Sequence, residues 1–305
     1  MLISEKMKQT DFSAAESALV AYILDKGIAI DELTIKEIAQ ATFVHPSTLI
    51  RVSKKLGFAG WVELKTALLE EQTYLQTYFD TVDANLPFDS MDGVMTIANK
   101  IATLERTTLD DTLSLLNHDN LQAAKQLVLK ANQIKVFGSN ANTLISQDFA
   151  LKMRRIGKNV TPCQTLYETA YEAYNCQPND CCILISYTGE NEMILQTAEI
   201  LKQGNIPFIG LTSIGDNTLA KLSNTTLRLT TRERLYSKIG NFTINTSISY
   251  LLDVLYSCIF AEEYSHNLNH LIAIGETVDT RKTSSEIMEE SPEFRLQFSE
   301  SFRPN

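Results

Sequence analysis

The chain has 305 residues, of which 44% are hydrophobic and 21% are charged, and its formal net charge is −10. This length favours two domains, each of which can bury a core of its own. The acidic balance argues against a protein that coats nucleic acid with its whole surface, but recognition depends on local charge, so a specific DNA-binding segment remains open.

Two capping boxes mark the first helices of the chain. Ser13-x-x-Glu16 opens a helix with an apolar stripe, and Gly27 is placed to end it. Thr34-x-x-Glu37 opens a second, shorter helix. A tight turn follows, so a helical bundle is expected over this part of the chain.

The next helix has two different faces. Pro46 stands where its first residue should be, and Gly57 is placed to stop it. Winding at 3.6 residues per turn gives an apolar face, formed by Leu49, Val52 and Leu56. The opposite face is basic and hydroxylic, formed by Ser47, Arg51, Lys54 and Lys55. Such a helix suits the DNA major groove, where arginine reads guanine edges and lysine or serine holds phosphates.

These features predict a helix-turn-helix in which the second helix reads DNA. We expect Ser47, Thr48 and Arg51 to contact base edges, and Lys54 and Lys55 to contact phosphates. Residues 45–65 contain four basic residues and one acid, a local balance of 4 − 1 = +3. The alternative is a helical bundle whose basic face is merely solvated. The short connection, with the basic face confined to the second helix, favours DNA binding.

Strands and helices alternate from about residue 119 onward, which predicts a doubly wound parallel sheet covered on both faces. The expected strands lie at 134–137, around Val160, and at 181–185, 207–211 and 226–229. The chain is therefore expected to consist of a helix-turn-helix domain over 1–75, a helical linker over 76–118, the sheet domain over 119–265 and a tail over 266–305.

Three of the predicted strands end in small hydroxyl or amide residues: Gly138-Ser139-Asn140, Ser186-Tyr187-Thr188-Gly189 and Thr212-Ser213. Ligands of doubly wound sheets bind beyond the carboxyl ends of the strands. Hydroxyls and free N–H groups at a helix N-terminus supply donors for an anion, and a phosphate is the natural guest. The loops match neither a P-loop nor a dinucleotide fingerprint. The alternative is a set of ordinary capped turns.

Other ligand and targeting signals are weak. The five cysteines are odd in number and lack paired C-x-x-C spacing, so no disulfide framework or zinc site is predicted. His266 and His270 have metal-ligand spacing without a third ligand in sight, so no metal and no cofactor are expected. Residues 1–10 lack a secretory pattern, and the apolar run over 250–261 is too short to span a bilayer. A cytoplasmic protein without a membrane partner is expected.

The two halves together resemble the RpiR/MurR-type bacterial transcription regulators. The helix-turn-helix part of the resemblance rests on Ile38-Ala39, Val44, Ser47-Thr48, Arg51, Lys55-Leu56-Gly57-Phe58 and Gly60-Trp61-x-Glu63-Leu64-Lys65. The second half resembles the sugar isomerase (SIS) domain through Val136-Phe137-Gly138-Ser139 and Ile185-Ser186-Tyr187-Thr188-Gly189-Glu190-Asn191.

The resemblance implies a regulator of carbohydrate or amino-sugar metabolism that binds double-stranded operator DNA as a homodimer or homotetramer and senses a sugar phosphate. It places the phosphate at a site comprising Ser139, Asn140, Ser186, Thr188 and Asn191. Asn140 stands where a second serine is common, and Asn191 where threonine usually closes the loop. In the DNA-binding turn, Phe43 replaces a small residue and His45 replaces a serine.

Two alternatives follow from the same residues. A sugar-phosphate isomerase of the aldose–ketose type would need a base near the sugar carbons. Glu190 and Glu168 are the nearest candidates, and neither lies in a recognisable catalytic context, so we expect no enzyme. Alternatively, the SIS domain serves only to dimerise the chain.

Overall fold

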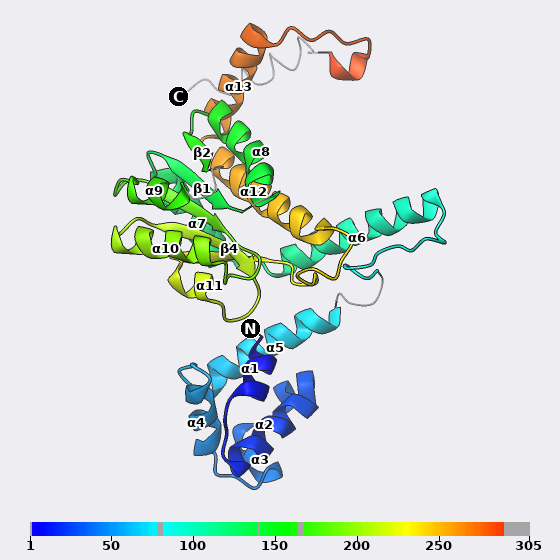
Figure 1. The fold of residues 1–305 in the computed structure, drawn as a ribbon, viewed down its shortest axis with the longest axis vertical. Helices are drawn as coiled ribbons and strands as arrows, with labels where there is room; N and C mark the ends of the chain where they lie inside the picture. Colours follow the sequence, from blue (N-terminus) through cyan, green and yellow to red (C-terminus); the bar gives the residue numbers. More distant parts are fainter. Residues whose placement is uncertain (1, 78–81, 140, 164–167, 290–305) are drawn as a thin grey trace, which may run out of the picture.

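The computed structural model describes residues 2–77, 82–139, 141–163 and 168–289 (Figure 1). A group of N-terminal helices lies at one end and a sheet covered by helices lies at the other (Figure 1). This arrangement confirms the predicted fold class, an all-α N-terminal part followed by a doubly wound α/β domain.

The N-terminal helices pack around their own apolar cluster. They are α1 (Ile3–Gln9), α2 (Ala14–Lys26), α3 (Ile35–Ala41), α4 (Ser47–Lys55) and α5 (Trp61–Thr77), with the 3-10 helix η1 (Gly27–Glu32) after α2. Both capping boxes form: the hydroxyls of Ser13 and Thr34 accept from the N–H groups of Glu16 and Glu37. Pro46 is the N-cap of α4 and not its first residue, so the helix begins one residue later than the sequence suggested.

The second domain is built on a five-stranded parallel sheet with strand order β2-β1-β3-β4-β5. The strands are β1 (Ile134–Gly138), β2 (Val160–Cys163), β3 (Cys181–Ile185), β4 (Phe208–Ser213) and β5 (Thr225–Leu229). All five residues of the central strand β3 are buried, because helices cover both of its faces. The chain order reverses between β1 and β3, which is where this fold class binds its ligands.

Two separate apolar clusters hold the helices to the sheet. One face packs α7 (His118–Lys130), α8 (Ala141–Arg155) and α12 (Phe242–Glu262). The other packs α9 (Thr169–Tyr174), α10 (Glu192–Gln203) and α11 (Thr218–Leu222). By length and composition alone, α12 is the one helix of the described residues that could cross a membrane. Its Ile248, Leu251 and Leu255 are fully buried in the first cluster, as in the core helix of a globular domain.

The segment expected to be a linker contains a 21-residue helix, α6 (Val94–Ser114). The C-terminal half of α6 is joined to the sheet domain by buried hydrogen bonds. The Thr112 hydroxyl donates to Ser247 Oγ of α12 at 2.9 Å, and the Thr230 hydroxyl donates to the carboxylate of Asp111. Residues 266–278, expected in the tail, belong to the helix α13 (Tyr264–Val278). A short 3-10 helix, η2 (Glu286–Met288), follows it.

Candidate nucleic-acid interface and phosphate site

The helix α4 presents the two faces that its sequence predicts. Leu49 and Val52 are fully buried and Leu56 is 1% exposed, all three within the N-terminal cluster. The outward face is formed by exposed side chains, namely Ser47, Ile50, Arg51, Lys54 and Lys55. Of these, Ile50 was not singled out from the sequence, and its 44% exposure places an apolar group beside the basic ones.

Thr48 differs from the other predicted DNA contacts because it is only 6% exposed. It lies four residues before the buried Val52 and next to Leu49, so it belongs to the inward side of the helix. The prediction that Thr48 contacts base edges is therefore corrected: its side chain belongs to the packing of α4 onto the bundle.

Glu16 joins α2 to the basic face of α4. The Arg51 Nε donates to Glu16 Oε1 at 2.7 Å, and the Lys55 Nζ donates to Glu16 Oε2 at 2.8 Å. Glu16 itself is 2% exposed. The Lys55 ammonium, the backbone N–H of Ser13 and the Arg51 guanidinium lower the pKa of Glu16 from 4.5 to about 2, although burial opposes them. The carboxylate is therefore ionised throughout the physiological range.

The turn before α4 carries two unusual residues. Phe43 has φ +54°, in the left-handed region, and its side chain is 97% exposed. Non-glycine residues with an exposed side chain rarely adopt this conformation. The ring nitrogen His45 Nδ1 lies 2.9 Å from Ser47 Oγ, so the imidazole forms a hydrogen bond with the serine hydroxyl at the start of the helix.

Of the three predicted phosphate loops, the two after β1 and β3 follow neighbouring strands at the point where the strand order reverses, and the loop at Thr212-Ser213 lies at the end of the next strand, β4. Gly138 of β1 pairs with Ile185 of β3, so Ser139 and Ser186 each stand one residue beyond a paired position on neighbouring strands. Ser186 is 5% exposed, and its N–H donates to Leu211 O of the next strand. No hydrogen bond to another described residue engages the Ser139 or Ser186 hydroxyl. Asn140 lies outside the described residues.

The loop after β3 is held in a tight conformation. Gly189 has φ +69°, and a Cβ at this position would lie 2.1 Å from Asn217 Oδ1. Thr188 is exposed, and its hydroxyl accepts from the N–H of Glu190 at 3.1 Å. The Asn191 Oδ1 accepts from the N–H of Ile194 at 3.2 Å, which makes Asn191 the N-cap of α10. Sequence reasoning treated Asn191 as a changed ligand group and missed this capping role.

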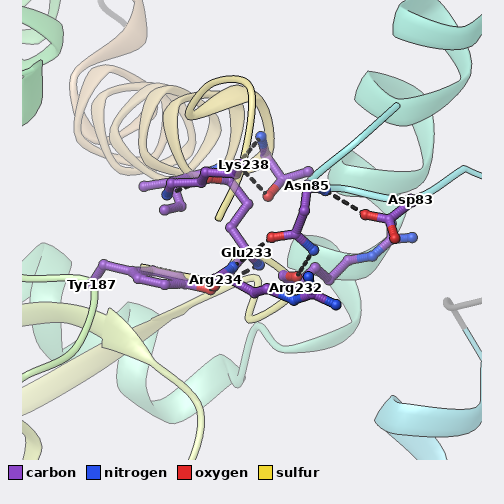
Figure 2. A network of polar contacts seen from close by, with 9 residues as sticks. Asp83, Asn85, Tyr187, Arg232, Glu233, Arg234 and Lys238 are labelled. Atoms are coloured by element: carbon purple, nitrogen blue, oxygen red, sulfur yellow. Dashed lines mark hydrogen bonds and ion pairs between the residues drawn. The ribbon is translucent and has the colours of Figure 1, made fainter. Parts of the chain in front are cut away.

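A buried polar network adjoins the same loop (Figure 2). The Tyr187 hydroxyl donates to Glu233 O at 2.9 Å and accepts from Glu233 N at 3.1 Å. The Glu233 carboxylate accepts from the N–H groups of Thr243 and Ile244 at the start of α12, and pairs with Lys238 Nζ at 2.8 Å. Figure 2 shows Tyr187, Glu233 and Lys238 together with Asn85, whose side-chain amide bonds to the backbone of Arg232 and Arg234 on either side of Glu233.

This network fixes the residue that follows Ser186. Burial raises the pKa of the Tyr187 hydroxyl, so it stays protonated and keeps donating. Sequence reasoning included Tyr187 in a motif without giving it a role, and it missed Glu233, which lies 46 residues away and matches no motif.

The other candidates have structural surroundings. Glu190 Oε1 accepts from the N–H of Thr218 at 2.8 Å, and Glu168 is exposed beside a part of the chain that is not described. The His266 and His270 rings stack at 6.3 Å, and no group of three metal-ligating side chains exists among the described residues. Cys181 and Cys182 are buried thiols of the central strand.

The fold and the two sites define a protein that joins a helix-turn-helix to an α/β domain of the SIS type. Residues 1–74 match the sequence model of the helix-turn-helix domain of the rpiR family, and residues 127–257 match that of the SIS domain. The chain therefore joins a helix-turn-helix domain that matches the rpiR type to a domain that matches the SIS type.

Two of the similar proteins extend over both parts of the chain, and a third matches the second part alone. An uncharacterized HTH-type transcriptional regulator from Caldanaerobacter subterraneus subsp. tengcongensis is 26% identical over 279 residues, covering 90% of this chain and 96% of the relative. The Vibrio vulnificus NanR protein, solved in complex with ManNAc-6P, is 21% identical with a TM-score of 0.56, covering 90% of this chain and 97% of NanR. The sugar isomerase domain of an RpiR transcription factor from Sphaerobacter thermophilus is 16% identical with a TM-score of 0.52, covering 59% and 98%.

Proposed function

We propose that this transcriptional regulator binds operator DNA through α4 and is controlled by a sugar phosphate bound between β1 and β3. Ser47 and Arg51 contact base edges, and Lys54 and Lys55 contact phosphates. The observation that carries the DNA-binding part is the face of α4, on which exposed cationic side chains stand over a fully buried apolar back. The regulator controls carbohydrate or amino-sugar metabolism and acts in the cytoplasm, where the chromosome is.

The effector site is proposed to comprise Ser139, Asn140, Ser186, Thr188 and Asn191. Ser139 and Ser186 supply hydroxyl donors from neighbouring strands, and the start of α10 adds backbone N–H groups of the kind that bind anions. Because Asn191 already caps α10, its amide oxygen is directed to the backbone, and Ser186 is expected to contribute more to phosphate binding. The structural likeness to NanR makes ManNAc-6P the first compound to test.

A contact between the two domains supports effector control. Lys6 Nζ of α1 donates to Leu56 O, at the C-terminal cap of α4, at 2.7 Å. The same ammonium donates to Asp216 Oδ2, in the loop between β4 and α11, at 3.0 Å. Asp216 directly precedes Asn217, whose side chain packs against Gly189 of the phosphate loop. A ligand that moves the loop containing Gly189 can therefore displace Asp216 and, through Lys6, act on α4, the proposed recognition helix.

The protein is proposed to work as a non-catalytic homodimer or homotetramer. Glu190, a candidate base in the loop after β3, accepts a backbone hydrogen bond from Thr218 and so ties this loop to the start of α11. In a dimer, a change in the separation of the two recognition helices alters the fit to two operator half-sites.

Selection of bound fragments from genomic DNA at moderate salt tests this proposal. The purified protein should enrich discrete sites, and one sugar phosphate of a panel that includes ManNAc-6P should release or strengthen them. Discrete sites that respond to no compound would leave the SIS domain only a dimerising role. Binding without any site preference, combined with isomerase activity on the same panel, would support the enzyme instead.

A further inference from the structure

Glu16 bonds to two basic side chains of α4, the proposed recognition helix. It is a buried carboxylate of α2, 35 residues from Arg51 in the chain, and both of its oxygens accept from the basic face of α4. A hydrogen bond between charged groups is about twice as strong as a neutral one, so the guanidinium is held at one edge. The Arg51 side chain remains 59% exposed, so the rest of the group is available to a ligand.

The contact with Glu16 determines which edge of the Arg51 guanidinium remains available to DNA. Because the Nε of Arg51 donates to Glu16, the side-on pair of donors that includes Nε is engaged within the protein. Neither terminal nitrogen of Arg51 bonds to another residue that the structure describes, so the two remain available as an end-on fork. Such a fork matches the O6 and N7 acceptors that guanine presents in the major groove.

Glu16 also limits the phosphate attraction of the helix. Arg51, Lys54 and Lys55 carry three positive charges, and Glu16 removes one, which leaves 3 − 1 = +2. Lys55 is held toward α2 by this pair and lies 5.5 Å from the centre of the Phe12 ring. Lys54 makes no ion pair among the residues that the structure describes. It is therefore the basic side chain of α4 with the greatest freedom to reach a phosphate.

We infer that Glu16 is a positioning residue for base recognition, which fixes Arg51 in the end-on orientation for a guanine and restrains non-specific attraction to the DNA backbone. The inference rests on the proposed DNA-binding function. It assigns the sequence preference of α4 in part to a residue of a different helix that does not face the DNA.

The test is the substitution Glu16→Gln, which removes the charge and keeps the capping box, because glutamine serves at this helix position as glutamate does. Glu37→Gln is the matched control. Glu37 closes the capping box of α3 with Thr34, at 2.8 Å from the Thr34 N–H, and no basic side chain among the described residues bonds to it. Folding of each variant is checked by the fluorescence of Trp61.

Affinity is measured for a selected operator and for the same operator with one G·C pair changed to A·T. The pair is chosen so that the Arg51→Ala protein binds the original and the changed operator with equal affinity. Wild type should prefer the original site by about 5- to 150-fold, the range of one bidentate arginine–guanine contact. Glu16→Gln should lower this ratio by about fivefold or more and raise affinity for random DNA by about twofold. Glu37→Gln should match wild type in both.

A positioning role requires that Glu16 act through Arg51. In the Arg51→Ala background, Glu16→Gln should therefore no longer change the base preference, while the gain in random-DNA affinity through Lys55 should remain. If Glu16→Gln kept the wild-type ratio of affinities for the original and changed operators, this inference would be overturned and the proposed function would stand. An equal loss in Glu37→Gln would assign the effect to helix capping and overturn it as well. Wild-type protein without any base preference would overturn the proposed function.

Discussion

The turn before the recognition helix stores backbone strain that one substitution should release. Phe43 adopts φ +54°, and its ring is 97% exposed. The left-handed conformation costs an L-residue about 1–2 kcal/mol, and glycine adopts it freely. Glycine adds about 0.5–1 kcal/mol of chain entropy to the unfolded state, which offsets part of the gain. Almost no burial is lost with the ring, so Phe43→Gly should stabilise the N-terminal domain by about 0.5–1 kcal/mol.

Trp61 allows this change to be measured in the whole chain. It is the single tryptophan of the sequence, and it is 4% exposed within the N-terminal cluster. Its fluorescence therefore follows unfolding of that domain. In a domain of this size the gain corresponds to a rise in Tm of about 2–8 °C. The urea midpoint should rise without a change in slope.

Phe43→Ala separates the backbone from the ring, because alanine removes the ring and keeps the strain. We expect its stability to be close to that of wild type. A Phe43→Gly protein no more stable than wild type would refute the reasoning from backbone strain. A Phe43→Ala protein as stable as Phe43→Gly would show that the exposed ring causes the instability.

Four further outcomes are expected. Arg51→Ala should weaken specific DNA binding by about 1–3 kcal/mol, and an unchanged site preference in a binding titration would remove Arg51 from base readout. Gly189→Ala should abolish the effector response in the same titration, because its Cβ would overlap Asn217 Oδ1 at 2.1 Å; a normal response would mean that the loop tolerates the change. Lys6→Ala should reduce the effector-induced change in operator affinity while the exposed Lys8→Ala does not, and equal behaviour would exclude the Lys6 contact as a coupling route. The pKa of Glu16 is lowered from 4.5 to about 2, so the stabilisation it gives is present above pH 4.5 and is lost as the pH falls toward 2. Glu16→Gln should flatten this part of the dependence of stability on pH, followed by Trp61 fluorescence. An acid profile identical to that of wild type would contradict the pairing of Glu16 with Arg51 and Lys55.

The elements with strong local signals were predictable from the sequence. The capping boxes at Ser13 and Thr34 set the start of two helices, and the unbroken apolar run of residues 181–185 identified the central strand. The two faces of α4 followed from helical periodicity alone. Thr48 was misplaced because it lies at the border between these faces. There, a small rotation of the helix about its axis decides whether a side chain faces the bundle or the solvent.

Contacts between distant residues were beyond sequence reasoning. Glu16 reaches Arg51 and Lys55 across 35 and 39 residues, and Tyr187 reaches Glu233 across 46. No spacing rule connects such positions, because tertiary packing alone brings them together. The neighbouring positions of Ser139 and Ser186 likewise depend on strand order, which alternation of strands and helices does not determine.

We propose that one sugar phosphate, bound beyond β1 and β3, controls DNA binding by α4. The most direct test is a fluorescence anisotropy titration of a selected operator with wild-type and Ser186→Ala protein, in the presence of increasing sugar phosphate. We expect one compound to shift the operator affinity of wild type, whereas Ser186→Ala should bind the operator equally well without the compound and show no shift. A full response in Ser186→Ala would place the effector elsewhere, and loss of operator binding without any effector would contradict the separation of the two sites.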